Sequence, residues 1–180
     1  MPLSQPAARE HLHRRKIDCR GYRRQDGLWD IEAHLTDDKT YATKSALRGD
    51  LAPGEAIHDL SLRLTLDGDL VVRAVETASD ATPYAACPRA TENFQTLVGL
   101  RIAAGWNREI IARVGGVRGC THLRELLGVL ATVAFQTIFT LREKELIESG
   151  RKPPMLDSCH AWDSAGAVVK AQYPAWYSGD

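Results

Sequence analysis

The stretch LWDIEAHL, residues 28–35, decides the fold. Its apolar residues stand at every second position: Trp29, Ile31, Ala33 and Leu35. This alternation is the period of a β-strand that buries one face against a core. Segment 14–24 precedes it, and the turn pair Asp26-Gly27 between them is typical of antiparallel strands joined by a tight turn. The fold therefore opens with a predicted β-hairpin.

A second hairpin is expected further along the chain. Leucines alternate with polar residues over 60–66, residues 67–69 (Asp-Gly-Asp) form a turn, and 70–76 return. The intervening residues 36–56 are polar and rich in turn residues, so we expect a connection there. The simplest arrangement of these segments is a meander of four antiparallel strands.

Beyond residue 87 the apolar period changes from 2 to 3.6, which indicates helices. We expect helices over 88–99, with Pro88 in the first position, over 107–114, with Asn107 as the cap, and over about 121–147. The longest carries its apolar residues at helical spacing and should lie across the sheet. The predicted fold class is α+β: an antiparallel four-stranded meander sheet with three helices packed on one face.

This pattern suggests three parts of the chain. Residues 1–13 form a flexible lead-in, 14–150 a single α+β domain, and 151–180 an extended C-terminal arm. The arm is too aromatic to stay free, so its rings should pack on the domain or on a partner subunit: Trp162, Tyr173, Trp176 and Tyr177. The chain is therefore a candidate homodimer.

Composition excludes several classes of protein. In 180 residues, 23 lysines and arginines balance 23 aspartates and glutamates, so no net field recruits nucleic acid or an anionic membrane. The longest apolar stretch, 126–139, falls short of the ~20 residues of a membrane span, and no signal peptide is visible. Four scattered cysteines suit free thiols, ligands or nucleophiles. A cytoplasmic protein with a small-molecule substrate is expected.

The candidate site residues gather at predicted helix and strand starts. Cys87, as the N-cap before Pro88, and Cys120, just before the longest helix, lie where a helix dipole favours thiolate, and the same position keeps His122 neutral. The alternative is that both cysteines are small buried residues. His58 and Asp59 begin a strand, where a hydrogen-bonded strand-entry pair is the competing explanation.

Several motifs in order resemble one family across nearly the whole chain. Residues 21–32, 58–60, 119–123 and 131–136 are similar to the bacterial domain-of-unknown-function family 2889 (DUF2889). That resemblance implies no activity.

Residues 56–139 also resemble, in layout, the NifU/IscU-type scaffold proteins of iron–sulfur cluster assembly. In that family three cysteines and an aspartate form one metal or cluster pocket. The matching positions here are His58 with Asp59, Cys87 and Cys120, with histidine in place of the first cysteine and His122 as an added candidate. The resemblance implies that these residues converge, and such a set suits a single Zn²⁺ or Fe²⁺ ion at least as well as a cluster.

The leading hypothesis is a small enzyme acting on a small organic substrate through a Cys/His/Asp pocket, as a metal-dependent or cysteine-dependent lyase or hydrolase. With a divalent metal, Zn or Fe, the ligands would come from His58, Cys87, Cys120 and His122, and Asp59 would orient a histidine or act as general base. Without one, Cys120 would be the nucleophile with His58 or His122 as base. A non-catalytic metal, iron–sulfur or sulfur-handling protein and a protein–protein interaction module stay open.

Overall fold

The computed structural model describes residues 3–180, with the side chain of residue 146 excepted. Residues 1 and 2 of the predicted lead-in lie outside the described residues, and residues 3–12 contain no helix or strand. The chain divides into two compact units, one ending at Ala134 and the other formed by Phe135–Asp180. The predicted domain limits at residues 14 and 150 stay a prediction.

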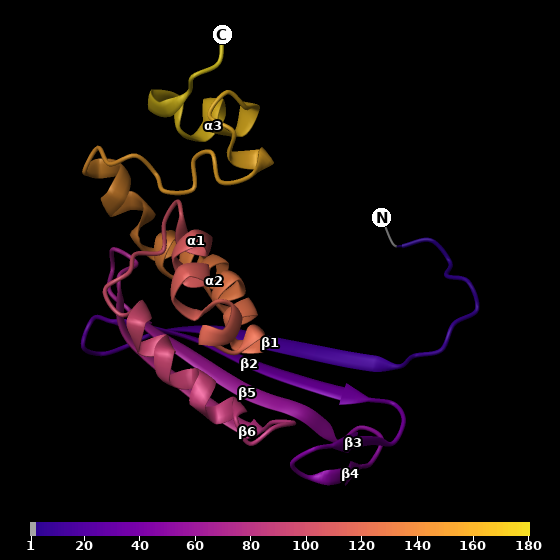
Figure 1. Ribbon diagram of the computed structural model, residues 1–180. Coiled ribbons are helices and arrows are strands. Elements are labelled where there is room, and N and C mark those ends of the chain that lie inside the picture. The colour runs from indigo at the N-terminus through magenta and orange to yellow at the C-terminus, as the bar shows by residue number, and fades with distance from the viewer. Residues whose placement is uncertain (1–2) are drawn as a thin grey trace. The chain divides into compact units, whose positions relative to one another are not determined.

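The first unit is built on a four-stranded antiparallel sheet (Figure 1). Its strands, in spatial order, are β1 (His13–Arg23), β2 (Trp29–Lys39), β5 (Ala56–Leu66) and β6 (Val72–Ala81). Neighbours in the sheet follow one another along the chain except for a small hairpin, β3 (Thr43–Ser45) and β4 (Gly49–Leu51), which forms a separate two-stranded sheet. The predicted meander is confirmed.

The prediction of a plain connection over 36–56 is wrong. β2 continues to Lys39, and the small hairpin follows it. The continuation is possible because the carboxylates of Asp37 and Asp38, which favoured a turn, are paired with arginines of β1. Opposite charges that face each other on neighbouring strands stabilise the strand pairing, so these two aspartates remain part of β2.

Helices cover one face of the sheet, which confirms the α+β class (Figure 1). They are η1 (Cys87–Leu97), α1 (Trp106–Val114), η2 (Gly116–Arg118) and α2 (Thr121–Glu148). The first segment is a 3-10 helix. Gly105 is the N-cap of α1, two residues before Asn107, so the prediction of Asn107 as the cap is wrong. The indole N–H of Trp106 donates to the carbonyl oxygen of Leu127 at 3.1 Å, which fixes α1 against α2.

The core lies between this face and the helices. The inward residues of β2 and β5 are almost fully buried, as are the leucines of the first turns of α2: Leu123, Leu126, Leu127 and Leu130. By length and composition alone, Thr121–Glu145 would also be long and apolar enough to cross a membrane. A third of its most apolar window is buried inside the structure.

The second unit has a small core of its own. It contains the last turns of α2, the short helix α3 (Ala167–Gln172) and the 3-10 turns η3 (His160–Trp162) and η4 (Pro174–Trp176). Leu156, Val169 and Tyr173 are buried together, and three further aromatic side chains pack against them: Trp162, Trp176 and Tyr177. Residues 151–180 are therefore folded into short helices, where an extended arm was predicted.

Candidate metal centre

A row of three residues crosses the sheet near one end. Arg15 of β1 pairs in register with Asp37 of β2, and Asp37 pairs with His58 of β5. Because side chains alternate along a strand, Asp37 and His58 face the helices like the buried leucines two positions away, Leu35 and Leu60. Three neighbouring strands thus bring a cation, a carboxylate and an imidazole to one place.

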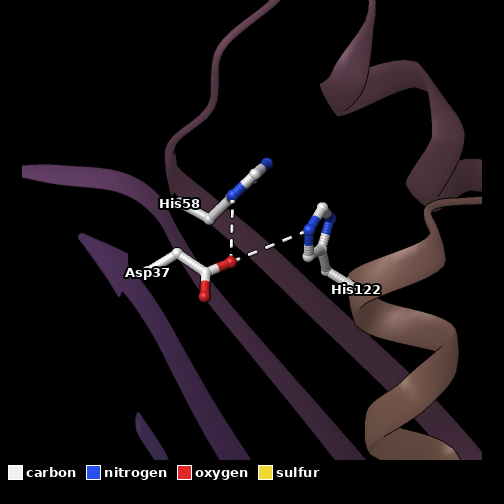
Figure 2. A group of neighbouring side chains, drawn as sticks. All are labelled: Asp37, His58 and His122. Atoms are coloured by element: carbon white, nitrogen blue, oxygen red, sulfur yellow. Dashed lines mark ion pairs between the residues drawn. The ribbon is translucent and has the colours of Figure 1, made fainter. Parts of the chain in front are cut away.

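The helix layer adds a second imidazole to this row (Figure 2). His122 lies in the first turn of α2, and its Nε2 atom is 3.7 Å from Oδ2 of Asp37, while Nδ1 of His58 is 3.2 Å from the same oxygen. The two rings are 3.8 Å apart between centroids. One ligand atom from each of Asp37, His58 and His122 can be chosen so that all lie within 4.8 Å of one another.

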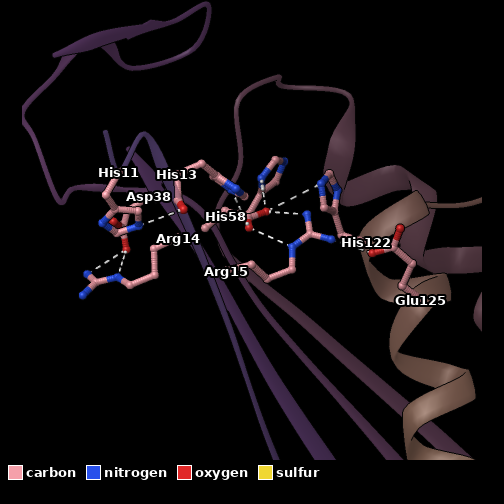
Figure 3. Close-up of polar contacts among 9 residues, drawn as sticks. His11, His13, Arg14, Arg15, Asp38, His58, His122 and Glu125 are labelled. Atoms are coloured by element: carbon pink, nitrogen blue, oxygen red, sulfur yellow. Dashed lines mark hydrogen bonds and ion pairs between the residues drawn. The ribbon is translucent and has the colours of Figure 1, made fainter. Parts of the chain in front are cut away.

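The carboxylate of Asp37 is held from the opposite side by β1 (Figure 3). Arg15 donates from Nε to Oδ1 and from Nη2 to Oδ2, both at 2.8 Å, and a ring nitrogen of His13 lies 3.1 Å from Oδ1. The remaining Nη1 of Arg15 donates to Glu125 of α2 at 2.6 Å. Arg15 therefore ties the sheet to the helix that carries His122.

Asp37 is charged in this setting although its side chain is only 4% exposed. Burial by itself raises the pKa of Asp37, but the hydrogen bonds and charge of Arg15, helped by the two histidines, outweigh it and hold the pKa below its usual value. A buried carboxylate is thus kept as an anion, which is the form that binds cations.

The two histidines are neutral at neutral pH. Burial lowers the pKa of His58, and the neighbouring His122 lowers it further. Burial also lowers the pKa of His122, and the charge of Arg15 lowers it further. The negative charge of Asp37 acts to raise the pKa of both histidines but does not reverse either shift. Neutral imidazoles keep a nitrogen lone pair, which is what metal binding requires.

These spacings suit a single metal ion. Zn–N and Zn–O bonds of ~2.0–2.1 Å place the ligand atoms of a tetrahedral site about 3.3 Å apart, and the 3.2 and 3.7 Å separations lie on either side of that value. Two imidazole nitrogens and one carboxylate oxygen suit Zn²⁺ or Fe²⁺. Arg15 stands in the place of an outer partner that orients a ligating carboxylate.

A pocket of about 220 Å³ opens beside the two histidines. His58 and His122 line it together with Cys87 and Cys120, so four of the five predicted site residues share one cavity. Apolar side chains make up much of the remaining wall: Leu60, Pro83, Tyr84 and Ala90. The pocket offers two thiols and two imidazoles to a small molecule with an apolar part.

The two thiols occupy different positions at the starts of their helices. Cys120 precedes α2, its carbonyl oxygen accepts the N–H of Arg124 as a capping residue's does, and its Sγ is 3.9 Å from Nδ1 of His122. Cys87 is the first residue of η1, where the capping position belongs to Ala86. The predicted N-cap role of Cys87 is therefore wrong by one residue.

Asp59 lies on the other face of the sheet. It follows His58 directly in β5, so strand alternation turns its side chain away from the pocket, where it is 2.5 Å from Nε2 of His34. The predicted roles of Asp59 as orienting residue or general base at this pocket do not fit that position. Asp37 occupies the place that was expected for Asp59.

Sequence reasoning missed Asp37 and Arg15. The signal for Asp37 was present, because it is the next inward position after Trp29, Ile31, Ala33 and Leu35. A carboxylate that continues an apolar alternation faces the core and needs a partner there. Arg15 is that partner.

The chain belongs to the family described as "Protein of unknown function (DUF2889)", whose sequence profile matches residues 13–136. This range contains Arg15, Asp37, His58, Cys87, Cys120 and His122. No curated protein and no solved structure matches the chain. The resemblance of residues 56–139 to iron–sulfur scaffold proteins stays a prediction.

Proposed function

We propose that Asp37, His58 and His122 bind one divalent metal ion, and that the protein is a metal-dependent enzyme acting on a small organic molecule in the adjacent pocket. The observation that carries the proposal is the approach of two neutral imidazoles to one oxygen of a buried, charged carboxylate. A divalent cation between the three groups would bind a lone pair of each imidazole and balance the charge of the carboxylate.

Three protein ligands are typical of catalytic sites because they leave a coordination position for water or substrate. A metal ion in such a site supplies Lewis acidity and lowers the pKa of a bound water, which suits a hydrolase or a lyase. Nitrogen and oxygen ligands in this number favour a single ion over a cluster scaffold, which needs thiolates.

The chain's own groups have separate tasks in this proposal. Arg15 holds Asp37 in the orientation that both histidines face. The apolar wall near Leu60 and Ala90 excludes water from the substrate, and Cys120 presents its sulfur beside His122. The substrate is therefore a molecule with an apolar part and one polar group that turns toward the histidines.

A second candidate is a thiol enzyme without a metal. It is favoured by the 3.9 Å contact between Sγ of Cys120 and Nδ1 of His122, with Asp37 beyond the other ring nitrogen. Here His122 would take the proton of Cys120 at Nδ1 and donate from Nε2 to Asp37. The metal site instead needs Nε2 without a proton, so the two functions require opposite tautomers of His122.

The deciding experiment compares Asp37→Asn with Asp38→Asn. Both aspartates are buried and paired with an arginine, but only Asp37 faces the histidines. In protein purified without an affinity tag, we expect stoichiometric zinc or iron in the wild type and in Asp38→Asn. Asp37→Asn should lose at least ~100-fold in affinity, because outer partners alone are worth about 10–100-fold.

Equal metal affinity in the two variants, or no metal binding by wild-type protein, would refute the metal centre. Thiol reactivity then tests the second candidate in a Cys159→Ser background. Cys120 should be alkylated faster than Cys19, whose pKa is raised by burial, and Asp37→Asn should slow it. Visible absorption of thiolate-bound iron would instead favour a cluster-handling protein.

A further inference from the structure

The second unit contains a pocket of about 250 Å³ with no part in the proposed metal chemistry. One side is formed by the last turns of α2 and the other by residues 155–172. Three aromatic rings line it, those of Phe135, Phe139 and Trp162, together with the thioether of Met155. We propose that this pocket binds a small quaternary ammonium compound between its aromatic rings and the carboxylate of Glu143.

The charge of the pocket selects a cation. Glu143 contributes a carboxylate to the lining, and the other lining side chains are apolar or neutral. Within the described part of the chain, no lysine, arginine or histidine is among them. Aromatic faces also carry partial negative charge, so rings and carboxylate attract the same sign of ligand.

The aromatic wall and the carboxylate are both held in place. Trp162 packs against Tyr173 with ring centroids 5.6 Å apart, and its carbonyl oxygen accepts the N–H of Asp157 at 2.8 Å. The hydroxyl of Tyr173 donates to Oε1 of Glu143. Because Tyr173 is itself buried in the unit's small core, it fixes the carboxylate and the indole together.

The aromatic half of the lining distinguishes the kind of cation. A primary ammonium carries three N–H donors that require acceptors, whereas a methylated ammonium carries none and gains from contact with aromatic faces. Phe135, Phe139, Trp162 and Met155 meet the second requirement, and the polar half of the lining, Gln136, Thr140 and Gln172 beside Glu143, is left to bind a polar end of the ligand. A choline-like molecule has the matching shape, with a small polar end that can reach the amide of Gln172 at the pocket.

The test uses choline and its uncharged isostere 3,3-dimethylbutan-1-ol on the full-length wild-type protein. Binding is followed by the chemical shift of the Trp162 indole N–H, assigned by its loss in Trp162→Leu. We expect choline to bind at least about tenfold more tightly than the isostere, since cation–π attraction in a desolvated site supports a factor of this size. Equal affinities, or no binding by choline, would overturn the proposal.

A pair of variants on the same helix separates a specific contact from general charge. Glu143→Gln removes the pocket carboxylate while its amide still accepts the Tyr173 hydroxyl, and Glu148→Gln removes an equal charge from an exposed ion pair with Lys144. We expect about a tenfold loss of choline affinity in the first and less than about a twofold loss in the second. Similar losses in both would show general electrostatic attraction and overturn the site. Phe139→Leu, a milder change than Trp162→Leu, should weaken choline and spare the isostere.

Discussion

Replacement of Arg15 by methionine tests whether one guanidinium holds the candidate centre together. The change keeps most of the aliphatic side chain and removes every charged contact of Arg15. Asp37 then keeps its burial but loses two hydrogen bonds of 2.8 Å, and Glu125 loses one of 2.6 Å. The sheet and α2 are no longer tied together by a charge at this point.

The expected loss in the free energy of unfolding is about 3 kcal/mol. Hydrogen bonds to a charged group contribute roughly 1.5–3 kcal/mol each, and breaking a buried ion pair costs about 3–5 kcal/mol. The Arg15 side chain is 31% exposed, so the lower part of these ranges applies. The exposed contact with Glu125 adds less than about 1 kcal/mol.

Arg14→Met is the matched control on the neighbouring position of β1. Arg14 also pairs with a buried aspartate, Asp38, but it is 46% exposed and contacts a single carboxylate oxygen. We expect a loss of about 1 kcal/mol for this variant. Urea unfolding with a chelator present removes any stabilisation by bound metal.

Tryptophan fluorescence can report on the first unit alone. Trp29 and Trp106 are buried there, whereas Trp162 and Trp176 belong to the second unit and can be replaced by phenylalanine in every protein compared. The slope of the free energy against urea concentration should be unchanged by either arginine substitution. If Arg15→Met costs no more than Arg14→Met, the guanidinium does not organise this site and the reasoning is refuted.

Three further perturbations have effects whose direction follows from the structure. Gly119→Ala would place a Cβ atom 2.3 Å from the carbonyl oxygen of Val114, so urea unfolding should show that the free energy of unfolding falls by more than about 2 kcal/mol. Gly128→Ala, in open space within α2, should instead stabilise the protein by about 0.5–1 kcal/mol. An unchanged stability in Gly119→Ala would contradict the packing beside Cys120. Burial first, and then the hydrogen bond to Glu143, raise the pKa of Tyr173 to about 12. The contribution of Tyr173 to stability is therefore complete below the unfolded pKa of about 10 and is lost as the pH rises through about 12. A near-ultraviolet titration should show one tyrosine that ionises at higher pH than the others, and Tyr173→Phe should remove that step.

The sheet could be predicted because its signals are local. Alternation over 28–35 and 60–66 identifies two strands with one buried face, and the structure buries those inward side chains almost completely. The helix that begins at Thr121 was equally visible from its leucine spacing. The ends of the strands were harder to predict. Aspartate is common in turns, but the two aspartates at the end of β2 pair with β1 and belong to the strand.

The candidate site was only partly predictable because its decisive contact is not local. His58, Cys87, Cys120 and His122 were chosen from their positions at strand and helix starts, and the structure places all four around one pocket. The choice between Asp59 and Asp37 depended on strand phase. Asp59 is next to His58 in sequence and therefore on the opposite face, whereas Asp37 is distant in sequence and directly across the ladder.

The hairpin at Asp26-Gly27 nevertheless contains the information that locates Asp37. It pairs Arg14 with Asp38 and Arg15 with Asp37, so two consecutive arginines meet two consecutive aspartates across one antiparallel ladder. A slip of β1 by one residue would turn the side chain of Arg15 to the face opposite Asp37 and leave a buried carboxylate without its guanidinium. These two ion pairs therefore select the register of the first hairpin. The same register sets Asp37 opposite His58 on β5 and puts the carboxylate within reach of His122. An interaction that stabilises the sheet is thus also the one that assembles the proposed ligands.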